Sequence, residues 1–448
     1  MKYFLLVLMQ LLFLNVNCIH RAGHIRYHQP EQIHIAFGDS VSEILITWST
    51  ITSTPNSIVE YGVNDLNERA EGSAKRFVDG GPEARAQYIH RVKLTNLRPL
   101  TKYLYHCGSH YGWSEEFWFK TVDNETNWSP RLAVYGDMGN INARSLPRLQ
   151  EETQHNKYDA IIHVGDLAYD MRDDNGRMGD QFMRQLQPIA AYVPYMVCPG
   201  NHEEAYNFSH FRERFSMPGQ NDNLYYSFNL GPIHFISLTT ETYYYIEYGL
   251  RTLVNQYQWL LNDLKEANLP ENRAKRPWII TYGHKPMYCS DRVVDDCKEK
   301  DNRVRKGIPL TKWFGLENLF YKYGVDLHFS GHRHSYERMY PVYDYIVKKG
   351  SKKKPYYNPE APVHIITGSA GCQESMSNFT DVPPPWSAFR SSNYGFTVLE
   401  VYNSSHLHVQ QIAVDFGDYG EVIDDVWIVK TKHQYNKNYT PNKTIMFQ

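Results

Sequence analysis

Five short blocks, each directly after an apolar run, constrain the fold of this chain more than any other feature. The blocks are Gly-Asp-Met-Gly (136–139), Gly-Asp-Leu-Ala-Tyr (165–169), Gly-Asn-His-Glu (200–203), Gly-His (283–284) and Gly-His-Arg-His (331–334). The runs before them are Leu132–Tyr135, Ala160–Val164, Tyr195–Cys198, Trp278–Tyr282 and Val325–Phe329. Short apolar runs that end at glycine are typical of buried strands followed by tight loops. We therefore predict an α/β sheet whose loops meet at the carboxyl ends of its strands.

The polar side chains of these loops form a set suited to metal ions. They are carboxylates, a phenol, an amide and imidazoles, from Asp137, Asp166, Tyr169, Asn201, His284, His332 and His334. The set contains no thiolate, so it suits ferric iron, zinc, manganese or ferrous iron rather than Cu(I) or an iron–sulfur cluster. Seven ligands are too many for one tetrahedral ion. They suit two ions roughly 3.5–4 Å apart, which the Asp166 carboxylate can bridge.

The five blocks, in this order, resemble the signature of the purple acid phosphatases, a branch of the metallophosphoesterases. The resemblance runs from about Ile33 to the Tyr-Gly-Phe block at 394–396. It implies that a ferric ion is held by Asp137, Tyr169 and His334. A divalent ion (Zn, Mn or Fe) would be held by Asn201, His284 and His332, with Asp166 as the bridge. It also implies that His202 touches the substrate phosphate.

The function that this resemblance implies is that of a secreted acid phosphatase acting on small phosphate monoesters. The implied mechanism is metal-assisted hydrolysis, in which a metal-bound hydroxide attacks phosphorus without a phosphoenzyme. A phosphodiesterase or nucleotide pyrophosphatase stays open, because these reactions need the same two metals. A non-catalytic secreted binding protein is the alternative from another class. Lost metal ligands would mark such a protein, and all seven are present.

One stretch departs from the family pattern. Well-studied members have a further histidine shortly downstream of the position of His284, which serves as an acid for the leaving group. Residues 288–297 here read Tyr-Cys-Ser-Asp-Arg-Val-Val-Asp-Asp-Cys and contain no histidine. The proton could come from His202 or from a carboxylic acid, Asp295 or Asp296. We favour His202, because it is fixed beside a predicted ligand whereas the reach of the loop is unknown.

A chain of 448 residues suggests two domains. Residues 30–122 alternate apolar and polar side chains and predict an antiparallel β-sandwich. Its expected strands are Ile33–Phe37, Glu43–Ser49, Ser57–Tyr61, Tyr88–Leu94 and Glu116–Thr121. The block from Leu97 to Tyr105 resembles the tyrosine-corner region of fibronectin type III domains. Such a domain precedes the catalytic one in long purple acid phosphatases of plants and in a related animal form.

Residues 131–430 are predicted to form the α/β catalytic domain, because strands alternate with helical stretches after the polar linker Asp123–Pro130. Asn255–Asn268 and Leu316–Tyr323 carry apolar residues at helical spacing and are expected to cover the sheet. The resemblance implies a metallophosphoesterase fold of two packed β-sheets flanked by helices. The polar tail, residues 431–448, is expected to be loosely ordered.

The N-terminus and the sequons indicate a secretory route. Residues 1–18 read as a signal peptide, and their apolar run Tyr3–Leu14 is too short to span a bilayer. No later stretch approaches transmembrane length. Glycosylation is predicted at Asn124, Asn207, Asn378, Asn403, Asn438 and Asn442. The expected location is extracellular or the lysosomal lumen.

The six cysteines and the net charge bear on disulfides and on partners. Cys289 and Cys297 flank a short polar loop just after His284, and secretion favours a disulfide between them. Once Cys18 leaves with the signal, an odd count leaves one thiol free or paired between chains, so a homodimer stays open. Cys198, at the end of an apolar run, is the expected free thiol. A net charge of −2 gives no support for nucleic-acid binding.

Overall fold

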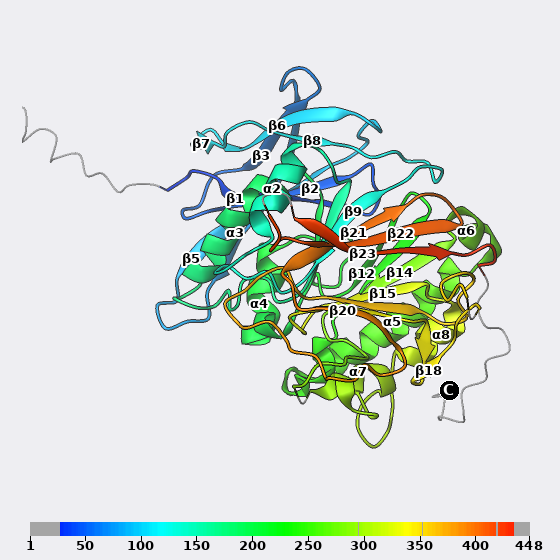
Figure 1. The fold of residues 1–448 in the computed structure, drawn as a ribbon. Helices are drawn as coiled ribbons and strands as arrows, with labels where there is room; N and C mark the ends of the chain where they lie inside the picture. The colour runs from blue at the N-terminus through cyan, green and yellow to red at the C-terminus, as the bar shows by residue number, and fades with distance from the viewer. Residues whose placement is uncertain (1–26, 294, 352, 418–419, 434–448) are drawn as a thin grey trace, which may run out of the picture.

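The computed structural model describes residues 27–293, 295–351, 353–417 and 420–433. Figure 1 shows an all-β unit, coloured blue to cyan, packed against a larger α/β unit. The predicted signal peptide (1–18), the sequons at Asn438 and Asn442 and the tail from 434 onward lie outside the described residues. The segment Asp123–Pro130 between the two units contains neither helix nor strand.

The N-terminal unit is the predicted antiparallel sandwich. Its strands pair in the order β1-β2-β5-β4-β3-β6-β7, with β8 also on β6. The long β4 joins the two halves, because Glu68–Gly72 pairs with β3 and Ser73–Val78 pairs with β5. The strands are β1 (Glu31–Phe37), β2 (Ile44–Thr50), β3 (Ser57–Gly62), β4 (Glu68–Val78), β5 (Ala86–Leu94), β6 (Lys102–Ser109), β7 (Gly112–Trp113) and β8 (Phe117–Lys120).

The block from Leu97 to Tyr105 adopts tyrosine-corner geometry. The buried Tyr103 hydroxyl accepts a hydrogen bond of 3.0 Å from the backbone N–H of Arg98. The strand β6 begins inside this block, and the sequence pattern did not reveal it. The pattern also missed β4, because almost all of its side chains are exposed and polar, which removes the apolar alternation.

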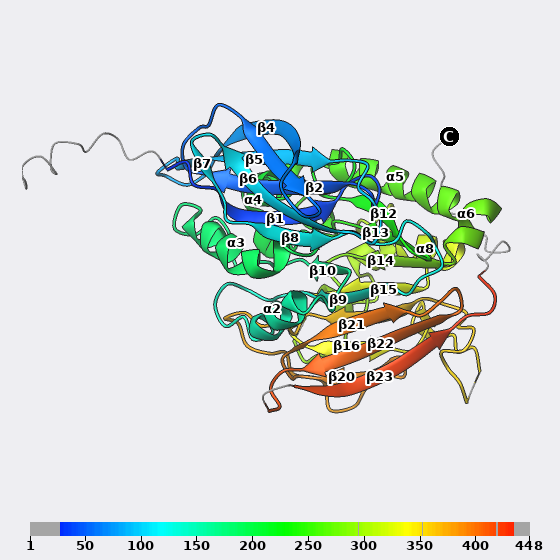
Figure 2. The same cartoon turned by 90° about the horizontal axis from the view of Figure 1, so that it is seen from above.

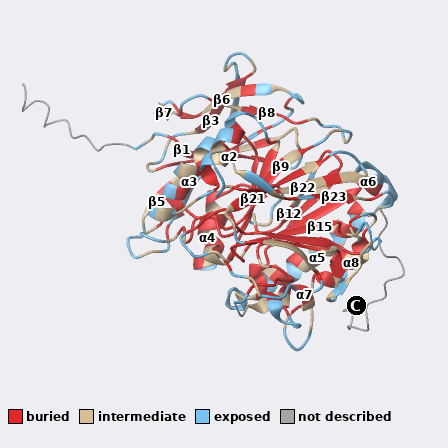
Figure 3. Cartoon of the chain, viewed as in Figure 1, coloured by how far each residue is buried: buried red, intermediate tan, exposed pale blue. Residues whose placement is uncertain are grey.

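The α/β unit contains two sheets that pack face to face (Figure 2). Their facing surfaces and the buried strands form the core of the unit, coloured red in Figure 3. The six-stranded sheet has the order β11 (Tyr195–Cys198), β10 (Ala160–Val164), β9 (Arg131–Tyr135), β21 (Gly395–Val401), β22 (His406–Ala413) and β23 (Glu421–Val429). The seven-stranded sheet has the order β12 (Tyr226–Leu230), β13 (Ile233–Ser237), β14 (Trp278–Tyr282), β15 (Leu327–Ser330), β19 (Val363–Thr367), β16 (Tyr336–Met339) and β20 (Ser387–Ser391).

Helices flank these sheets, as the resemblance implied. The predicted helix at Asn255–Asn268 runs from Arg251 to Ala267, and its buried residues Leu253, Leu260 and Leu264 pack in one apolar cluster with residues of the seven-stranded sheet. The helices are α2 (Leu146–Gln154), α3 (Arg177–Ala190), α4 (Ala205–Arg214), α5 (Arg251–Ala267), α6 (Pro270–Lys275), α7 (Arg303–Lys306) and α8 (Glu317–Tyr323). A small hairpin of β17 (Val342–Tyr343) and β18 (Ile346–Val347) lies outside the large sheets.

The cysteines follow the prediction in part. Cys289 and Cys297 form the predicted disulfide. The odd count suggested one free thiol, but Cys107, Cys198 and Cys372 are all unpaired and all buried. They lie on separate elements, namely β6, β11 and the loop after β19. Because these three thiols are buried, they give no support to a disulfide between chains.

A buried polar network joins the two units. The Asp180 carboxylate of α3 accepts hydrogen bonds from Arg214 (2.7 Å), from Gln87 (3.1 Å) and from Arg85. Arg85 and Gln87 belong to the sandwich, whereas Asp180 and Arg214 belong to the α/β unit. The side chains of Asp180 and Arg214 are each only 1% exposed. The buried Asp180 carboxylate therefore binds side chains of both units and joins them through Arg85 and Gln87.

We predict that Asp180→Ala strongly destabilises the protein, because it leaves the Arg214 guanidinium buried without a carboxylate. Removing one partner of a buried pair costs about 3–5 kcal/mol. The matched control is Glu83→Ala, which removes an exposed ion pair to Arg177 across the same interface and should change stability little. Urea denaturation of both variants checks this. Equal losses for the two variants would contradict a stabilising role of burial.

Candidate metal centre

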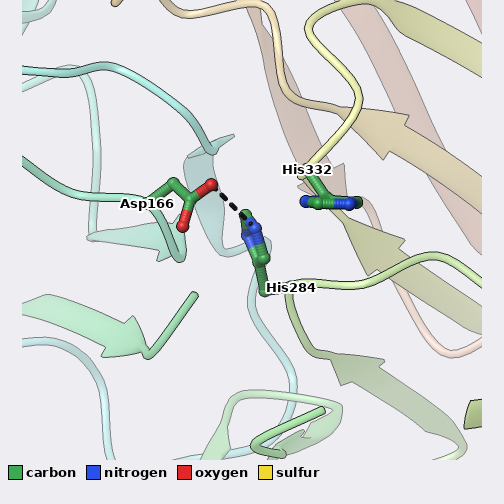
Figure 4. A group of neighbouring side chains, drawn as sticks. All are labelled: Asp166, His284 and His332. Carbon is green, nitrogen blue, oxygen red and sulfur yellow. Dashed lines mark ion pairs between the residues drawn. The ribbon is translucent and has the colours of Figure 1, made fainter. Parts of the chain in front are cut away.

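The predicted ligands come from loops at the carboxyl ends of two sets of parallel strands. The strands β9, β10 and β11 run parallel in one sheet, and β14 and β15 run parallel in the other. Their terminal loops meet where the two sheets adjoin. Figure 4 shows Asp166, which follows β10, beside His284 and His332, which follow β14 and β15. Residues almost 200 positions apart in sequence are thereby brought together.

One half of the site is centred on His284. Its Nε2 lies 3.0 Å from Oδ2 of Asp166 and 3.2 Å from Oδ1 of Asn201. Its Nδ1 lies 2.9 Å from the carbonyl oxygen of Val164, to which it donates, so Nε2 is free to accept or to bind a cation. The His332 ring centroid lies 5.2 Å from that of His284. Asp166, His284 and His332 each offer one possible ligand atom, and these three atoms lie within 4.8 Å of one another.

The other half of the site is centred on Tyr169. Its hydroxyl lies 2.7 Å from Nε2 of His334 and 3.2 Å from Oδ1 of Asp137. Nδ1 of His334 lies 3.1 Å from the carbonyl oxygen of Ser375, to which it donates. Nε2 of this ring therefore faces the Tyr169 hydroxyl and is free to bind a cation. The structure therefore brings together all seven predicted ligands in two adjoining groups, with the buried Asp166 in the first.

The backbone is strained at these ligands. Asp137, Asp166, Tyr169 and His332 have φ values of 60°, 50°, 52° and 66°. This left-handed region is unfavourable for residues with a side chain, and each instance costs on the order of 1–3 kcal/mol. Such strain persists where the surrounding structure fixes the conformation, and it concentrates at functional sites. Gly165 also has left-handed backbone, with φ +80°, which glycine adopts without strain. A Cβ at this position would lie 2.6 Å from the His284 ring.

Glu203 holds the strand-end loops in place. Its carboxylate accepts hydrogen bonds of 2.8–2.9 Å from the backbone N–H groups of Asp166, Leu167 and Gly200. The side chain is buried, and burial, followed by the charge of Asp166, raises its pKa to about 7. The role of Glu203 was not predicted from the sequence. The available signal was its place directly after the predicted residues Asn201 and His202.

The electrostatics of the site favour bound cations. Asp137 is fully buried, and burial, opposed by His284 and reinforced by the charge of Asp166, raises its pKa well above the ordinary value. The nearby Glu241 is also buried, and its Oε2 has no hydrogen-bond partner. Buried carboxylates require compensating positive charge or hydrogen bonds. Oxygen and imidazole donors without thiolate fit two borderline or hard metal ions.

His202 stands beside the ligands without joining either group. Its backbone N–H donates to Oδ1 of Asp166 at 2.9 Å, and its ring centroid lies 4.3 Å from that of Tyr169. Nδ1 lies 3.3 Å from Asp170, and Nε2 lies 3.7 Å from Glu374. Burial lowers the pKa of the imidazole, but the hydrogen bond to Asp170 and the surrounding carboxylates raise it to about 9.

The two loop aspartates have different environments. Asp295 Oδ2 lies 3.0 Å from Nε2 of His332 and 3.1 Å from Nη1 of Arg333. Burial raises its pKa, but the hydrogen bond with His332 and the positive charges of Lys285 and Arg333 outweigh burial and hold it below the ordinary value. Asp296 Oδ2 accepts from the backbone of Arg303 at 3.0 Å and from the Tyr244 hydroxyl. Asp295 is thus an ionised acceptor, and Asp296 is engaged elsewhere.

A cleft of about 500 Å³ opens onto the site. Its lining includes ligands from both groups, together with His202 and residues of two loops around Arg292 and Glu374. The residues are Asp166, Asn201, His202, Arg292, Val293, His332, Arg333, His334, Glu374, Ser375, Met376, Ser377 and Asn378. Lys285, whose Nζ lies 3.4 Å from Oδ1 of Asn201, is a further cation that the sequence analysis did not identify.

We predict that Glu203→Ala loosens the site, because three buried N–H groups lose their acceptor. Each unsatisfied buried group costs about 1–3 kcal/mol. Thermal unfolding should show a large loss for Glu203→Ala and a smaller one for Glu203→Gln, which keeps one carbonyl oxygen. Glu204→Ala is the control, since the hydrogen bonds of that side chain within the described part of the chain are with Arg172 and Tyr248, away from the strand-end loops. A Glu203→Ala protein as stable as the control would contradict the assigned role.

Family models match most of the chain. The model for calcineurin-like phosphoesterases matches residues 130–336. The model for the purple acid phosphatase N-terminal domain matches residues 30–121, and that for the iron/zinc purple acid phosphatase-like protein C matches residues 361–425.

Relatives and a solved structure agree with these matches. An acid phosphatase type 7 of Danio rerio is 55% identical over 411 residues, covering 90% of this chain and 92% of the relative. An acid phosphatase type 7 of Homo sapiens is 51% identical over 404 residues, covering 90% of this chain and 91% of the relative. The structure of purple acid phosphatase PPD1 from yellow lupin aligns with a TM-score of 0.74 at 25% identity, over 91% of this chain and 75% of that one.

The fold and the site thus define a calcineurin-like phosphoesterase. The chain belongs to the purple acid phosphatase family. These findings confirm the family and the fold class that were predicted from the sequence. They also confirm the predicted enzyme class, that of an acid phosphatase. The alternative of a non-catalytic binding protein is set aside.

Proposed function

We propose that this protein hydrolyses small phosphate monoesters at a dinuclear centre of one ferric and one divalent ion. Asp137, Tyr169 and His334 would hold the ferric ion. Asn201, His284 and His332 would hold Zn, Mn or Fe in the divalent state, and Asp166 would bridge. The observation that supports the proposal is the pair of adjoining ligand groups that face one cleft, with the buried Asp166 carboxylate in the group around His284.

The chain's own residues prepare this chemistry. When bound, the two ions would offset charge on the phosphate oxygens and activate the attacking water. His284 and His334 each donate Nδ1–H to a backbone carbonyl, which fixes the tautomer and presents Nε2 as the ligand atom. Asp166 is oriented by the N–H of His202, and its own N–H is held by Glu203. Little reorganisation is therefore needed at the ligand atoms when the ions bind.

His202 is proposed as the group that protonates the leaving oxygen. Since Nδ1 contacts Asp170, Nε2 is the atom that would carry the transferred proton. The side chain lines the cleft and lies next to the bridging carboxylate, within reach of a substrate held there. Asp295 and Asp296 are poorer candidates, because their oxygens are occupied by His332, Arg333, Arg303 and Tyr244.

We expect Asp166→Ala to abolish turnover of nitrophenyl phosphate and to deplete both metals, because one side chain serves both ions. Asp173→Ala, in an exposed and weakly paired position nearby, is the control and should retain both metals. Metal analysis by mass spectrometry and a colour assay measure the two effects. A bis(nitrophenyl) phosphodiester assayed in parallel tests the remaining alternative. Faster hydrolysis of the diester than of the monoester would overturn the proposed substrate class.

We expect His202→Ala to affect substrates according to their leaving groups. General acid catalysis contributes typically about 10²–10⁴-fold, so the loss should be large for alkyl phosphates and small for nitrophenyl phosphate. Both metals should stay bound, because His202 is not a ligand. The comparison is the double variant Asp295→Asn/Asp296→Asn. If only the double variant shows the leaving-group pattern, the proton comes from the loop and not from His202.

A secretory location is part of the proposal. It is supported by the disulfide between Cys289 and Cys297, which persists in oxidising compartments. The four predicted glycosylation sites within the described residues are exposed, as glycosylation requires: Asn124, Asn207, Asn378 and Asn403. Among the described residues, no helix is long and apolar enough to cross a membrane. A homodimer stays a prediction.

A further inference from the structure

We propose that the loop closed by the Cys289–Cys297 disulfide supports the divalent metal site, with Asp295 as the positioning residue for His332. This inference rests on the proposed function, because it takes His332 as a ligand of the divalent ion. The family pattern places a histidine in this stretch, and here the stretch carries carboxylates instead. Their contacts are with the Gly-His-Arg-His segment that follows β15.

The first contact is between Asp295 and the imidazole of His332. Oδ2 of Asp295 lies 3.0 Å from Nε2. An ionised carboxylate only accepts, so it selects the tautomer with hydrogen on Nε2 and leaves Nδ1 as the nitrogen available to a metal ion. Nζ of Lys285 also lies 3.0 Å from Nε2. An ammonium beside a divalent cation is unfavourable, so occupancy of the site favours the contact with Asp295 over that with Lys285.

The second contact is with Arg333, the residue between two proposed ligands. Its Nε donates to Asp291 and its Nη1 donates to Asp295 at 3.1 Å. Nη2 lies 3.4 Å from Oγ of Ser377. The Arg333 side chain is only 10% exposed, so these ion pairs are largely desolvated and strong. Two carboxylates of one loop thus fix the side chain of Arg333, and with it the backbone segment that carries His332 and His334.

The disulfide explains how a short polar loop can hold these positions. Oδ1 of Asp295 accepts from the backbone N–H of Cys297 at 3.4 Å, and the Asp291 carboxylate lies 3.8 Å from Sγ of Cys289. Asp295 is therefore hydrogen-bonded to one bridged residue, and Asp291 lies beside the other. A disulfide reduces the number of conformations available to the segment it closes. The aspartates are preorganised towards the metal ligands.

The decisive variants are Asp295→Ala and Asp295→Asn, with Asp296→Ala as the matched control in the same loop. Removing the carboxylate partner of a metal-bound histidine typically weakens metal binding about 10–100-fold. We expect that loss of zinc affinity for Asp295→Ala, measured by titration against a competing chelator. Asp295→Asn should recover part of it, because its amide oxygen still accepts from Nε2. Asp296→Ala should bind zinc like the wild type, since among the described residues its carboxylate accepts hydrogen bonds from Tyr244 and Arg303, neither of which is a proposed ligand.

Iron content serves as the internal reference. Asp295→Ala should retain its ferric ion, because Asp295 contacts no proposed ligand of that ion. Retained zinc affinity, or parallel loss of iron and zinc, would overturn the positioning role. The double variant Cys289→Ser/Cys297→Ser should weaken zinc binding in the same direction while iron stays bound. A wild-type protein that binds only one metal would instead overturn the proposed function, so the two failures are distinguishable.

Discussion

Buried negative charge at the meeting point of two sheets is the constraint on which the rest of this structure depends. The carboxylates of Asp137 and Asp166 are at most 2% exposed and stand near Glu203, which is also buried. Hydrogen bonds from the backbone N–H groups of His332, His202 and Asp166 balance part of this charge. Two bound cations would balance the remainder, which is why the donor set and the burial together favour a dinuclear centre. Removal of any one carboxylate alters the balance for the whole cluster.

The surrounding structure is arranged to hold these groups in positions that they would not adopt alone. Left-handed backbone at four proposed ligands occurs in the loops that follow the parallel strands, and at Asp166 the hydrogen bonds of Glu203 hold the loop. The disulfide loop supports the Gly-His-Arg-His segment from outside through Asp291 and Asp295. The N-terminal sandwich is fixed to the α/β unit by the hydrogen bonds of Arg85 and Gln87 to the buried Asp180 carboxylate. Rigidity of this kind would hold the proposed ligand atoms together for the binding of metal ions.

Sequence reasoning found the ligand-bearing loops because their signal is local: an apolar run, a glycine, and a polar side chain with few other uses. The strands before Asp137, Asp166 and Asn201 were placed within a residue or two for the same reason. The strand β4 was missed because an exposed strand has no apolar alternation. The roles of Glu203 and Asp295 could not be predicted, because each depends on contacts with residues about 35 positions away that only the tertiary fold creates.

The central claim is a tyrosine-ligated ferric ion beside a divalent ion, and the visible absorption spectrum of the purified protein, recorded with metal analysis, tests it most directly. The wild type should show a broad band from charge transfer between the Tyr169 phenolate and iron, with one iron and one further metal per chain. Tyr169→Phe should lose the band yet remain folded, because the phenyl ring fills most of the same buried space. A colourless and fully active wild type containing only zinc or manganese would contradict the claim.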